Sequence, residues 1–273
     1  MELLEEKVVV VTGAASGIGR ALAMAFAEQG CRLALVDIDD ARLLETADFV
    51  TARVKSCQIS THLCDVSDRA AMAQLPEGIV AEHGGIHILC NNAGVTMTKS
   101  FEESSMQDLD FVLGINLWGV LYGCHYFLPY LKKQGEGHIV NTSSLAAYMG
   151  MPTQSTYCLT KAAVKSLSES LRVELAQYNI GVTSIHPGTI RTNILRNAVA
   201  RSHADGDKTA KLMGMMDRFG LPPEKLAVKV VGAVKKNRMQ VRIGADAYLA
   251  DWAKRLFPRA IHLPLQLMFE KSL

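Results

Sequence analysis

The sequence predicts an α/β fold, a single doubly wound Rossmann-type domain with helices on both faces of a parallel sheet. Short runs of aliphatic and β-branched residues alternate with amphipathic stretches that have helical spacing. A cluster of glycines directly follows the first apolar run and opens the first helical stretch. The alternation continues from Lys7 to about Gly244 without a linker rich in Gly, Ser or Pro, which indicates one domain.

The individual elements are predicted in chain order from the apolar runs and the residues that end them. Val8–Val11 is short and β-branched, so we expect a buried strand, and Ile18–Gln29 is expected to form a helix with Gly30 as its C-cap. A second strand, Leu33–Val36, precedes a helix over Asp40–Lys55. Because helices join consecutive strands, the sheet is expected to be parallel and buried on both faces. Later strands are expected at Ile59–Leu63, His87–Cys90, His138–Asn141, Val182–Ile185 and Met239–Ile243.

The chain divides into a main domain, residues 1–244, and a C-terminal extension, residues 245–273. Within the main domain, Thr189–Gly220 is irregular and long enough to form a lid over a site. The extension starts with a helical pattern that ends at Pro258 and has an apolar side formed by Ala245, Leu249, Trp252 and Leu256. Such a side needs a partner, which could be its own domain, a second subunit or a membrane surface. We expect the apolar side to pack on the main domain or on a second subunit, rather than on a membrane. The oligomer is expected to be a homodimer or a homotetramer.

Composition and charge exclude several classes of protein. The chain has 29 Lys and Arg against 27 Asp and Glu, so no domain-wide basic field predicts nucleic-acid binding. The acidic start lacks the basic region of a secretory signal, and no uninterrupted apolar run reaches the length of a spanning helix. Six cysteines without a C-x-x-C pair and eight histidines without a metal-binding pair predict free thiols, a cytoplasmic protein and no metal site.

The glycine cluster is the first motif with chemical meaning. Its spacing is G-x-x-x-G-x-G, and it lies between the first strand and the first helix: Thr12-Gly13-Ala14-Ala15-Ser16-Gly17-Ile18-Gly19. Glycines allow a sharp turn and close approach of a ligand, while the helix N-terminus offers free N–H groups to a pyrophosphate. A glycine cluster alone can be a simple turn, but this position after a strand and before a helix predicts a dinucleotide-binding loop.

Asp37 ends the second strand, 18 residues after Gly19. A carboxylate at that point can accept hydrogen bonds from the adenosine ribose hydroxyls and would repel a 2′-phosphate, so the sequence favours NAD over NADP. Two alternatives stay open. Asp37 or Asp39 could cap the following helix, and Arg42 is near enough in sequence to meet a 2′-phosphate.

Tyr157 and Lys161 are four residues apart in a helical pattern over Ser155–Tyr178, which puts both side chains on one face. A phenol titrates near pH 10, and an adjacent ammonium can bring its pKa towards the working range of a general base. Ser144 lies just after a predicted strand, where its hydroxyl could bind a reacting oxygen. A lone Tyr-x-x-x-Lys is usually a helix surface pair. Together with the preceding glycine loop, however, the pair indicates a catalytic site.

With these motifs the chain resembles the short-chain dehydrogenase/reductase family over roughly residues 5–245. The resemblance implies a seven-stranded parallel sheet, with Tyr157 as general acid/base, Ser144 orienting the substrate oxygen and Lys161 binding the nicotinamide ribose. It implies that Asn116 holds a water in a proton relay. By the same resemblance, further cofactor contacts come from Gly13, Ser16, Gly17, Ile18 and Gly19 in the loop, then Asp65, Val66, Asn92, Ala93, Gly94, Pro187, Gly188, Ile190 and Thr192.

The sequence therefore predicts an NAD-dependent oxidoreductase that interconverts a secondary alcohol and a ketone. In the family, the enzymes that reduce C=C bonds have more residues between the tyrosine and the lysine. The spacing from Tyr157 to Lys161 therefore favours alcohol and ketone chemistry. Six methionines fall in segments that line the family's substrate pocket, which favours a hydrophobic substrate such as a steroid, terpenoid or long-chain compound: Met97, Met149, Met151, Met213, Met215 and Met216. The alternatives are an NADP-dependent reductase of a polar or 3-oxoacyl substrate, and a non-enzymatic nucleotide sensor or membrane-surface protein.

Overall fold

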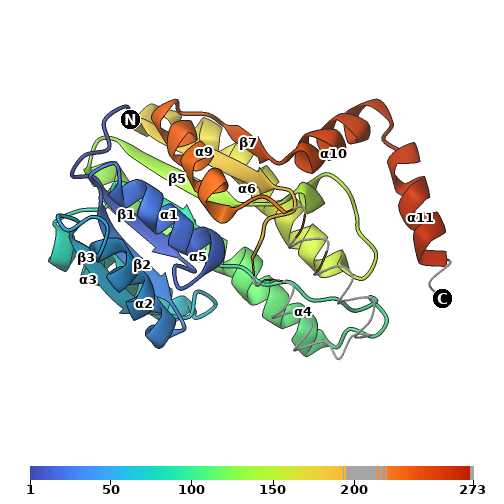
Figure 1. The fold of residues 1–273 in the computed structure, drawn as a ribbon, viewed down its shortest axis with the longest axis horizontal. Coiled ribbons are helices and arrows are strands. Elements are labelled where there is room, and N and C mark those ends of the chain that lie inside the picture. The colour runs from blue at the N-terminus through green and yellow to red at the C-terminus, as the bar shows by residue number, and fades with distance from the viewer. Residues whose placement is uncertain (193, 195–213, 215–217, 219, 271–273) are drawn as a thin grey trace.

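The computed structural model describes residues 1–192, 194, 214, 218 and 220–270 (Figure 1). Seven strands form one sheet in the order β3-β2-β1-β4-β5-β6-β7. Every neighbouring pair is parallel, as predicted. The strands are β1 Val8–Thr12, β2 Arg32–Asp37, β3 Ile59–Leu63, β4 Ile88–Asn91, β5 Gly137–Thr142, β6 Ile180–Pro187 and β7 Gln240–Ile243.

The strand order fixes where a ligand can enter. From β1 the chain moves outward through β2 to β3, and it then returns to the other side of β1 as β4. The connections on the two sides leave in opposite directions, so a crevice opens beyond the carboxyl ends of β1 and β4. The glycine loop follows β1 and the Asn91–Gly94 turn follows β4, which places both motifs at this crevice.

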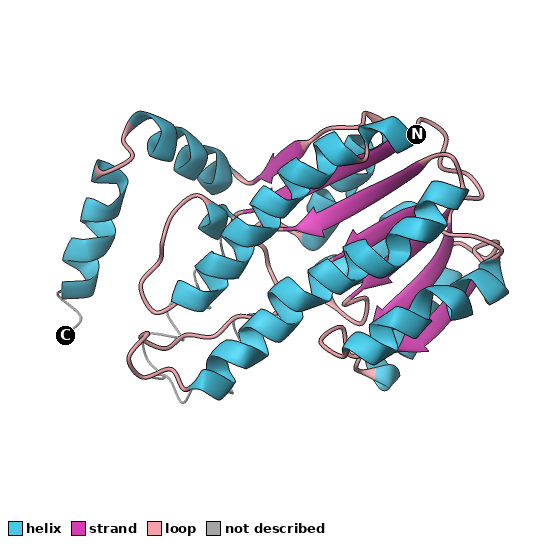
Figure 2. Cartoon of the chain, turned by 180° about the vertical axis from the view of Figure 1, so that it is seen from behind, coloured by secondary structure: helices cyan, strands magenta, loops and turns pink. Residues whose placement is uncertain are grey.

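Helices cover both faces of the sheet, and alternate residues of each strand point to opposite faces. Val9 and Val11 of β1 belong to the core under one layer of helices, whereas Val8 and Val10 belong to the core under the other. The first layer contains α1 Gly17–Ala27, α2 Asp40–Thr51 and α9 Pro223–Lys235. The second layer, which crosses in front of the strands in Figure 2, contains α3 Arg69–His83, α5 Gly119–Lys133 and α6 Ser155–Glu174.

One continuous helical segment, Met106–Lys133, joins α4 Met106–Leu113 to α5 through a π-helical turn at Gly114–Trp118. By length and hydropathy alone, this segment could cross a membrane. The sequence itself has no uninterrupted apolar run of spanning length. In this fold Val120, Cys124 and Phe127 are buried in the second core, which is an ordinary reason for an apolar helix. Pi-helical turns often mark functional sites, and this one carries Asn116.

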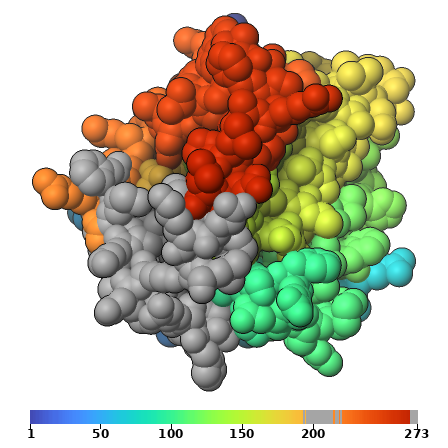
Figure 3. All heavy atoms as spheres, turned by 90° about the vertical axis from the view of Figure 1, so that its right-hand side faces the viewer, coloured from blue at the N-terminus to red at the C-terminus, as the bar shows by residue number. Residues whose placement is uncertain are grey.

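The C-terminal extension forms α10 Ala245–Leu256 and α11 Leu263–Glu270, which extend from the end of the sheet as an arm (Figure 1). The expected apolar side of α10 is not covered by its own domain, because Leu249 is 71% exposed and Trp252 is 59% exposed. Instead, α10 is anchored through Asp251, which pairs with Arg242 at 2.7 Å. Figure 3 views this end of the molecule and shows both helices at the surface.

Candidate active site

The glycine loop has the backbone shape that a phosphate-binding turn needs. Gly13 and Gly17 have positive φ angles of +67° and +52°, which favour glycine. Gly19 approaches the Gly13 carbonyl so closely that a Cβ atom would lie 1.9 Å from its oxygen. Ser16 is exposed and Ile18 is half-buried at the start of α1. The N-terminus of α1 is therefore open to an anion, and the residues present fit a pyrophosphate.

The turn after β4 is locked onto the glycine loop. The backbone N–H groups of Asn92 and Ala93 donate to the Thr12 hydroxyl at 3.0 and 3.1 Å. The Asn92 side chain donates to the Thr12 carbonyl at 2.9 Å. A Cβ atom on Gly13 would lie 2.8 Å from the Ala93 Cα, so the two segments also touch. These contacts close one wall of the crevice.

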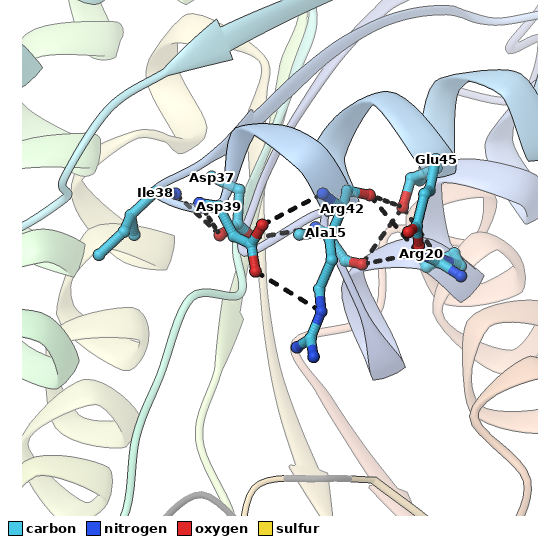
Figure 4. A network of polar contacts seen from close by, with 8 residues as sticks. Ala15, Arg20, Asp37, Ile38, Asp39, Arg42 and Glu45 are labelled. Atoms are coloured by element: carbon cyan, nitrogen blue, oxygen red, sulfur yellow. Dashed lines mark hydrogen bonds and ion pairs between the residues drawn. The ribbon is translucent and has the colours of Figure 1, made fainter.

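Asp37 connects the end of β2 to the same loop (Figure 4). Its Oδ2 accepts from the Ala15 backbone N–H at 2.9 Å, and its Oδ1 accepts from Ile38 and Asp39. A carboxylate has about four acceptor positions, so one remains for a ribose hydroxyl. The cap of α2 is Asp39, whose side chain accepts from the Arg42 N–H. Asp37 is therefore not the helix cap.

Two arginines near Asp37 are both engaged with acids (Figure 4). Arg42 lies 3.5 Å from Asp39, and Arg20 lies 3.4 Å from Glu45. Arg20 also donates to the Ala15 carbonyl at 3.0 Å, which ties α1 to the glycine loop. Sequence reasoning missed Arg20, although its position directly after Gly19 was a usable signal. The positive charges of both arginines near Asp37 are thus balanced by carboxylates.

The segment after β3 reaches the crevice from the other side of β2. Asp65 is exposed, and its Oδ1 accepts from both the backbone and the hydroxyl of Ser67. Val66 is buried against Gly119, where a Cβ atom would lie 2.9 Å from the valine Cγ2. Val66 thereby joins this segment to the start of α5.

Tyr157 and Lys161 lie on one face of α6, beside Ser144 at the end of β5. A hydrogen bond from Ser144 lowers the pKa of the Tyr157 phenol, but burial is the larger effect and the net pKa is raised. Burial lowers the pKa of Lys161 to about 8. The ammonium donates to the Thr142 carbonyl at 2.9 Å and lies 5.6 Å from the Tyr157 ring centroid. Desolvation of the phenolate is the largest of these effects, and a lowering of the Tyr157 pKa by Lys161 stays a prediction.

Asn116 lies on the π-helical turn and is fully buried. Its side-chain amide accepts from the Val95 N–H and donates to the Val95 carbonyl, each at 2.8 Å. A Cβ atom on Gly94 would lie 3.4 Å from the Asn116 Oδ1 and 3.5 Å from the Lys161 Nζ. Asn116 thus fixes the chain after the β4 turn directly beside Lys161.

The segment after β6 completes the opposite wall. Pro187 and Ile190 are buried, while Gly188 and Thr192 are half-buried. The Thr192 side chain lies 3.3 Å from the position that a Cβ atom on Gly17 would take, so this wall meets the glycine loop. The remainder of the expected lid lies almost entirely outside the described residues, as do Met213, Met215 and Met216.

A surface pocket begins at Tyr157 and runs towards α4. Met97, Phe101, Leu109 and Val112 form its apolar part, and a polar part comes from Ser104, Thr153, Gln154, Ser155 and Thr156. Lys99 and Asp108 also line it, and their side chains form a 2.7 Å ion pair. Tyr157 is one of the lining residues, so a molecule bound in the pocket would lie beside it. Met149 and Met151 are half-buried in the segment before α6.

The sheet, the glycine loop and the Ser144–Tyr157–Lys161 group define a Rossmann-type oxidoreductase. The chain belongs to the short-chain dehydrogenase family, whose model, described as short chain dehydrogenase, matches residues 7–203. The resemblance in the motifs is thereby confirmed at the level of the family.

Relatives support the same family over nearly the whole chain. SadH of Mycobacterium tuberculosis, described as a candidate oxidoreductase, is 36% identical over 94% of this chain and 92% of its own length. EphD of Mycobacterium bovis, also a candidate oxidoreductase, is 39% identical, but the match covers only 44% of its length. A short-chain dehydrogenase/reductase from Burkholderia phymatum, solved in complex with NAD, is 30% identical with a TM-score of 0.85 and covers 97% of both chains. This structure confirms the predicted fold class.

Proposed function

We propose that this enzyme uses NAD to interconvert a secondary alcohol and a ketone. The observation that carries the proposal is the grouping of Ser144, Tyr157 and Lys161 at the carboxyl edge of the sheet, beside a glycine loop that fits a dinucleotide. The nicotinamide, when bound, supplies or accepts the hydride. The Tyr157 phenol donates its proton to the carbonyl oxygen in reduction, and Ser144 orients that oxygen. Lys161, held by the Thr142 carbonyl, contributes positive charge beside them.

Preference for NAD rests on Asp37 and its neighbours. A 2′-phosphate would meet the Asp37 carboxylate, while Arg20 and Arg42 are already paired with acids. The B. phymatum relative was solved with NAD, and a more distant relative, an alcohol dehydrogenase from Thermococcus sibiricus, was solved with 5-hydroxy-NADP at 25% identity. Both nucleotides therefore occur among similar proteins, and the paired arginines are the observation that favours NAD here.

The apolar part of the pocket beside Tyr157 supports an apolar substrate. Its walls include Met97, Leu109 and Val112, and the charge of Lys99 is neutralised by Asp108. A carboxylate or phosphate substrate would have to break that ion pair. The second candidate, an NADP-dependent reductase of a polar or 3-oxoacyl substrate, is supported by Lys99 and by the polar residues that also line the pocket.

The test is a panel of ketones and alcohols of increasing size, assayed with NAD(H) and NADP(H). We expect kcat/KM to be highest for bulky apolar ketones with NADH. The variant Tyr157→Phe should lose turnover and keep nucleotide binding, because the phenol acts mainly in the transition state. Tyr178→Phe, in the 3-10 turn that follows α6, is the matched control and should retain activity. Near-normal kcat in Tyr157→Phe would reject the assignment, and nucleotide binding without turnover of any substrate would favour a nucleotide sensor.

We also infer a cytoplasmic homo-oligomer. The six cysteines are free, and five of them are buried, which suits a reducing compartment. The exposed apolar side of α10 supports a second subunit as its partner.

A further inference from the structure

The carboxylate of Asp246, in the first turn of α10, reaches back to the segment that follows β6. Its Oδ2 accepts from the Thr189 backbone N–H at 2.6 Å, and its Oδ1 accepts from the Ala247 N–H at 2.9 Å. A hydrogen bond to an ionised acceptor is about twice as strong as one between neutral groups. One side chain of the C-terminal extension therefore holds the backbone of the main domain beside the crevice.

The local backbone is shaped around this carboxylate. A Cβ atom on Gly188 would lie 1.9 Å from the Asp246 Oδ1, and a Cβ atom on Gly244 would lie 2.4 Å from the same oxygen. Any larger residue at either position would collide with it. The Gly188 N–H also donates to the Ile243 carbonyl at 2.8 Å. The two glycines thus create the space that the Asp246 carboxylate fills, between the ends of β6 and β7.

The segment that Asp246 holds leads directly to the wall of the crevice. Thr189 is followed by the buried Ile190, and Thr192 lies against Gly17 of the glycine loop. Asp37, in contrast, lies at the end of β2, and β1, β4 and β5 separate β2 from β6 in the sheet. A displacement of Gly188 and Thr189 would therefore disturb the β6 side of the crevice and leave the Asp37 side in place.

We propose that Asp246 is a positioning residue for the nicotinamide half of the cofactor, and this proposal rests on the function proposed above. It acts through the Thr189 backbone and does not touch the reacting atoms. Removal of its carboxylate leaves the Thr189 N–H without its acceptor and opens the space beside Gly188. The Gly188–Thr192 segment then no longer has one fixed position, so the nicotinamide is held less well while the adenosine half is held as before.

The decisive experiment compares two probes in the full-length protein, NADH and ADP-ribose, the second of which lacks the nicotinamide. We expect Asp246→Ala to weaken NADH binding about tenfold, the size of one lost charged hydrogen bond, and to leave ADP-ribose binding unchanged. Asp246→Asn keeps the shape and one acceptor oxygen, so its NADH affinity should be intermediate. Glu224→Ala, which removes an exposed acid from the first turn of α9, is the matched control and should change neither affinity.

A double-variant cycle tests the geometry independently. Gly188→Ala alone should weaken NADH binding, because its methyl group collides with the Asp246 carboxylate. In an Asp246→Ala background the same methyl group has room, so Gly188→Ala should add little. Fully additive effects would contradict the close contact between the two residues.

The outcomes separate the two proposals. If the wild-type protein does not bind NADH, the proposed function fails. If it binds NADH and Asp246→Ala keeps the ratio of NADH to ADP-ribose affinity, the positioning role is overturned while the proposed function stands. Equal weakening of both probes with a lower melting temperature would also overturn it, because Asp246 would then be a structural residue only.

Discussion

The buried ammonium of Lys161 should make the wild-type fold less stable than a variant without it. Burial lowers the Lys161 pKa from 10.5 to about 8. At about 1.36 kcal/mol per pKa unit, this displacement corresponds to about 3 kcal/mol of penalty on the charged form. Lys161→Met keeps the length of the side chain and removes the charge, but it also loses the hydrogen bond to Thr142, about 1 kcal/mol. We expect a net gain of about 2 kcal/mol at neutral pH, with loss of activity.

The pH dependence gives this prediction a distinctive form. Below about pH 8 the lysine is charged in both the folded and the unfolded states, so the penalty is fully present. Between about 8 and 10.5 the unfolded state binds more protons than the folded state, and wild-type stability rises with pH. The advantage of Lys161→Met should therefore shrink across this window and be absent above it.

Chemical denaturation of both proteins at a series of pH values between 7 and 10.5 measures this difference directly. Lys165→Met is the matched control, because Lys165 lies one turn further along α6 and forms a surface pair with Glu169. It should change stability by less than about 1 kcal/mol and show no convergence at high pH. If Lys161→Met is less stable than the wild type at pH 7, or if its advantage is constant with pH, the reasoning is refuted.

Four other predictions follow from the site and the arm. Asp37→Ala should weaken NAD binding about tenfold and narrow the preference over NADP; an unchanged preference in titrations with both nucleotides would reject the ribose role. Because burial raises the pKa of Tyr157, alcohol oxidation should accelerate between pH 7 and 10 while ketone reduction does not, as steady-state rates in both directions would reveal. Asp251→Ala leaves Arg242 without its acidic partner and should cost about 3 kcal/mol in denaturation experiments, whereas a neutral result would mean the pair is not buried in solution. Truncation after Phe257 should lower the number of subunits per particle measured by light scattering; an unchanged number of subunits with unchanged stability and activity would contradict packing of the extension against a subunit.

The strands and the common helix face of Tyr157 and Lys161 could be predicted because their signals are local. Burial on both faces makes the central strand β1 a nearly continuous apolar run, Val8–Thr12, and the edge strand β3 has the same bounds in the structure as in the prediction, Ile59–Leu63. The four-residue spacing of Tyr157 and Lys161 fixes their common face on any α-helix. Helix ends were less certain, since α1 ends at Ala27 rather than at Gln29.

Other features depend on contacts between distant segments. Asp246 meets Thr189, 57 residues away in sequence, and no periodic pattern indicates that contact. Periodicity also identifies which residues share a side of α10 without indicating which side is covered. Ala247, Ala250 and Asp251 are the buried residues, because an ion pair and small side chains seat the helix. The pKa of Tyr157 likewise depends on how much protein surrounds the phenol.

The three backbone contacts of Asp37 have a consequence for the engineering of cofactor use. The same carboxylate that faces the ribose position also joins the Ala15 N–H to the turn after β2. Replacement of Asp37 by a small residue, to admit a 2′-phosphate, also removes the hydrogen bond that holds the glycine loop. A redesign would therefore begin with neutralisation of Asp39, which releases Arg42 from its ion pair. Arg42 would then offer a positive charge at the edge of the site, while the hydrogen bonds of Asp37 stay intact.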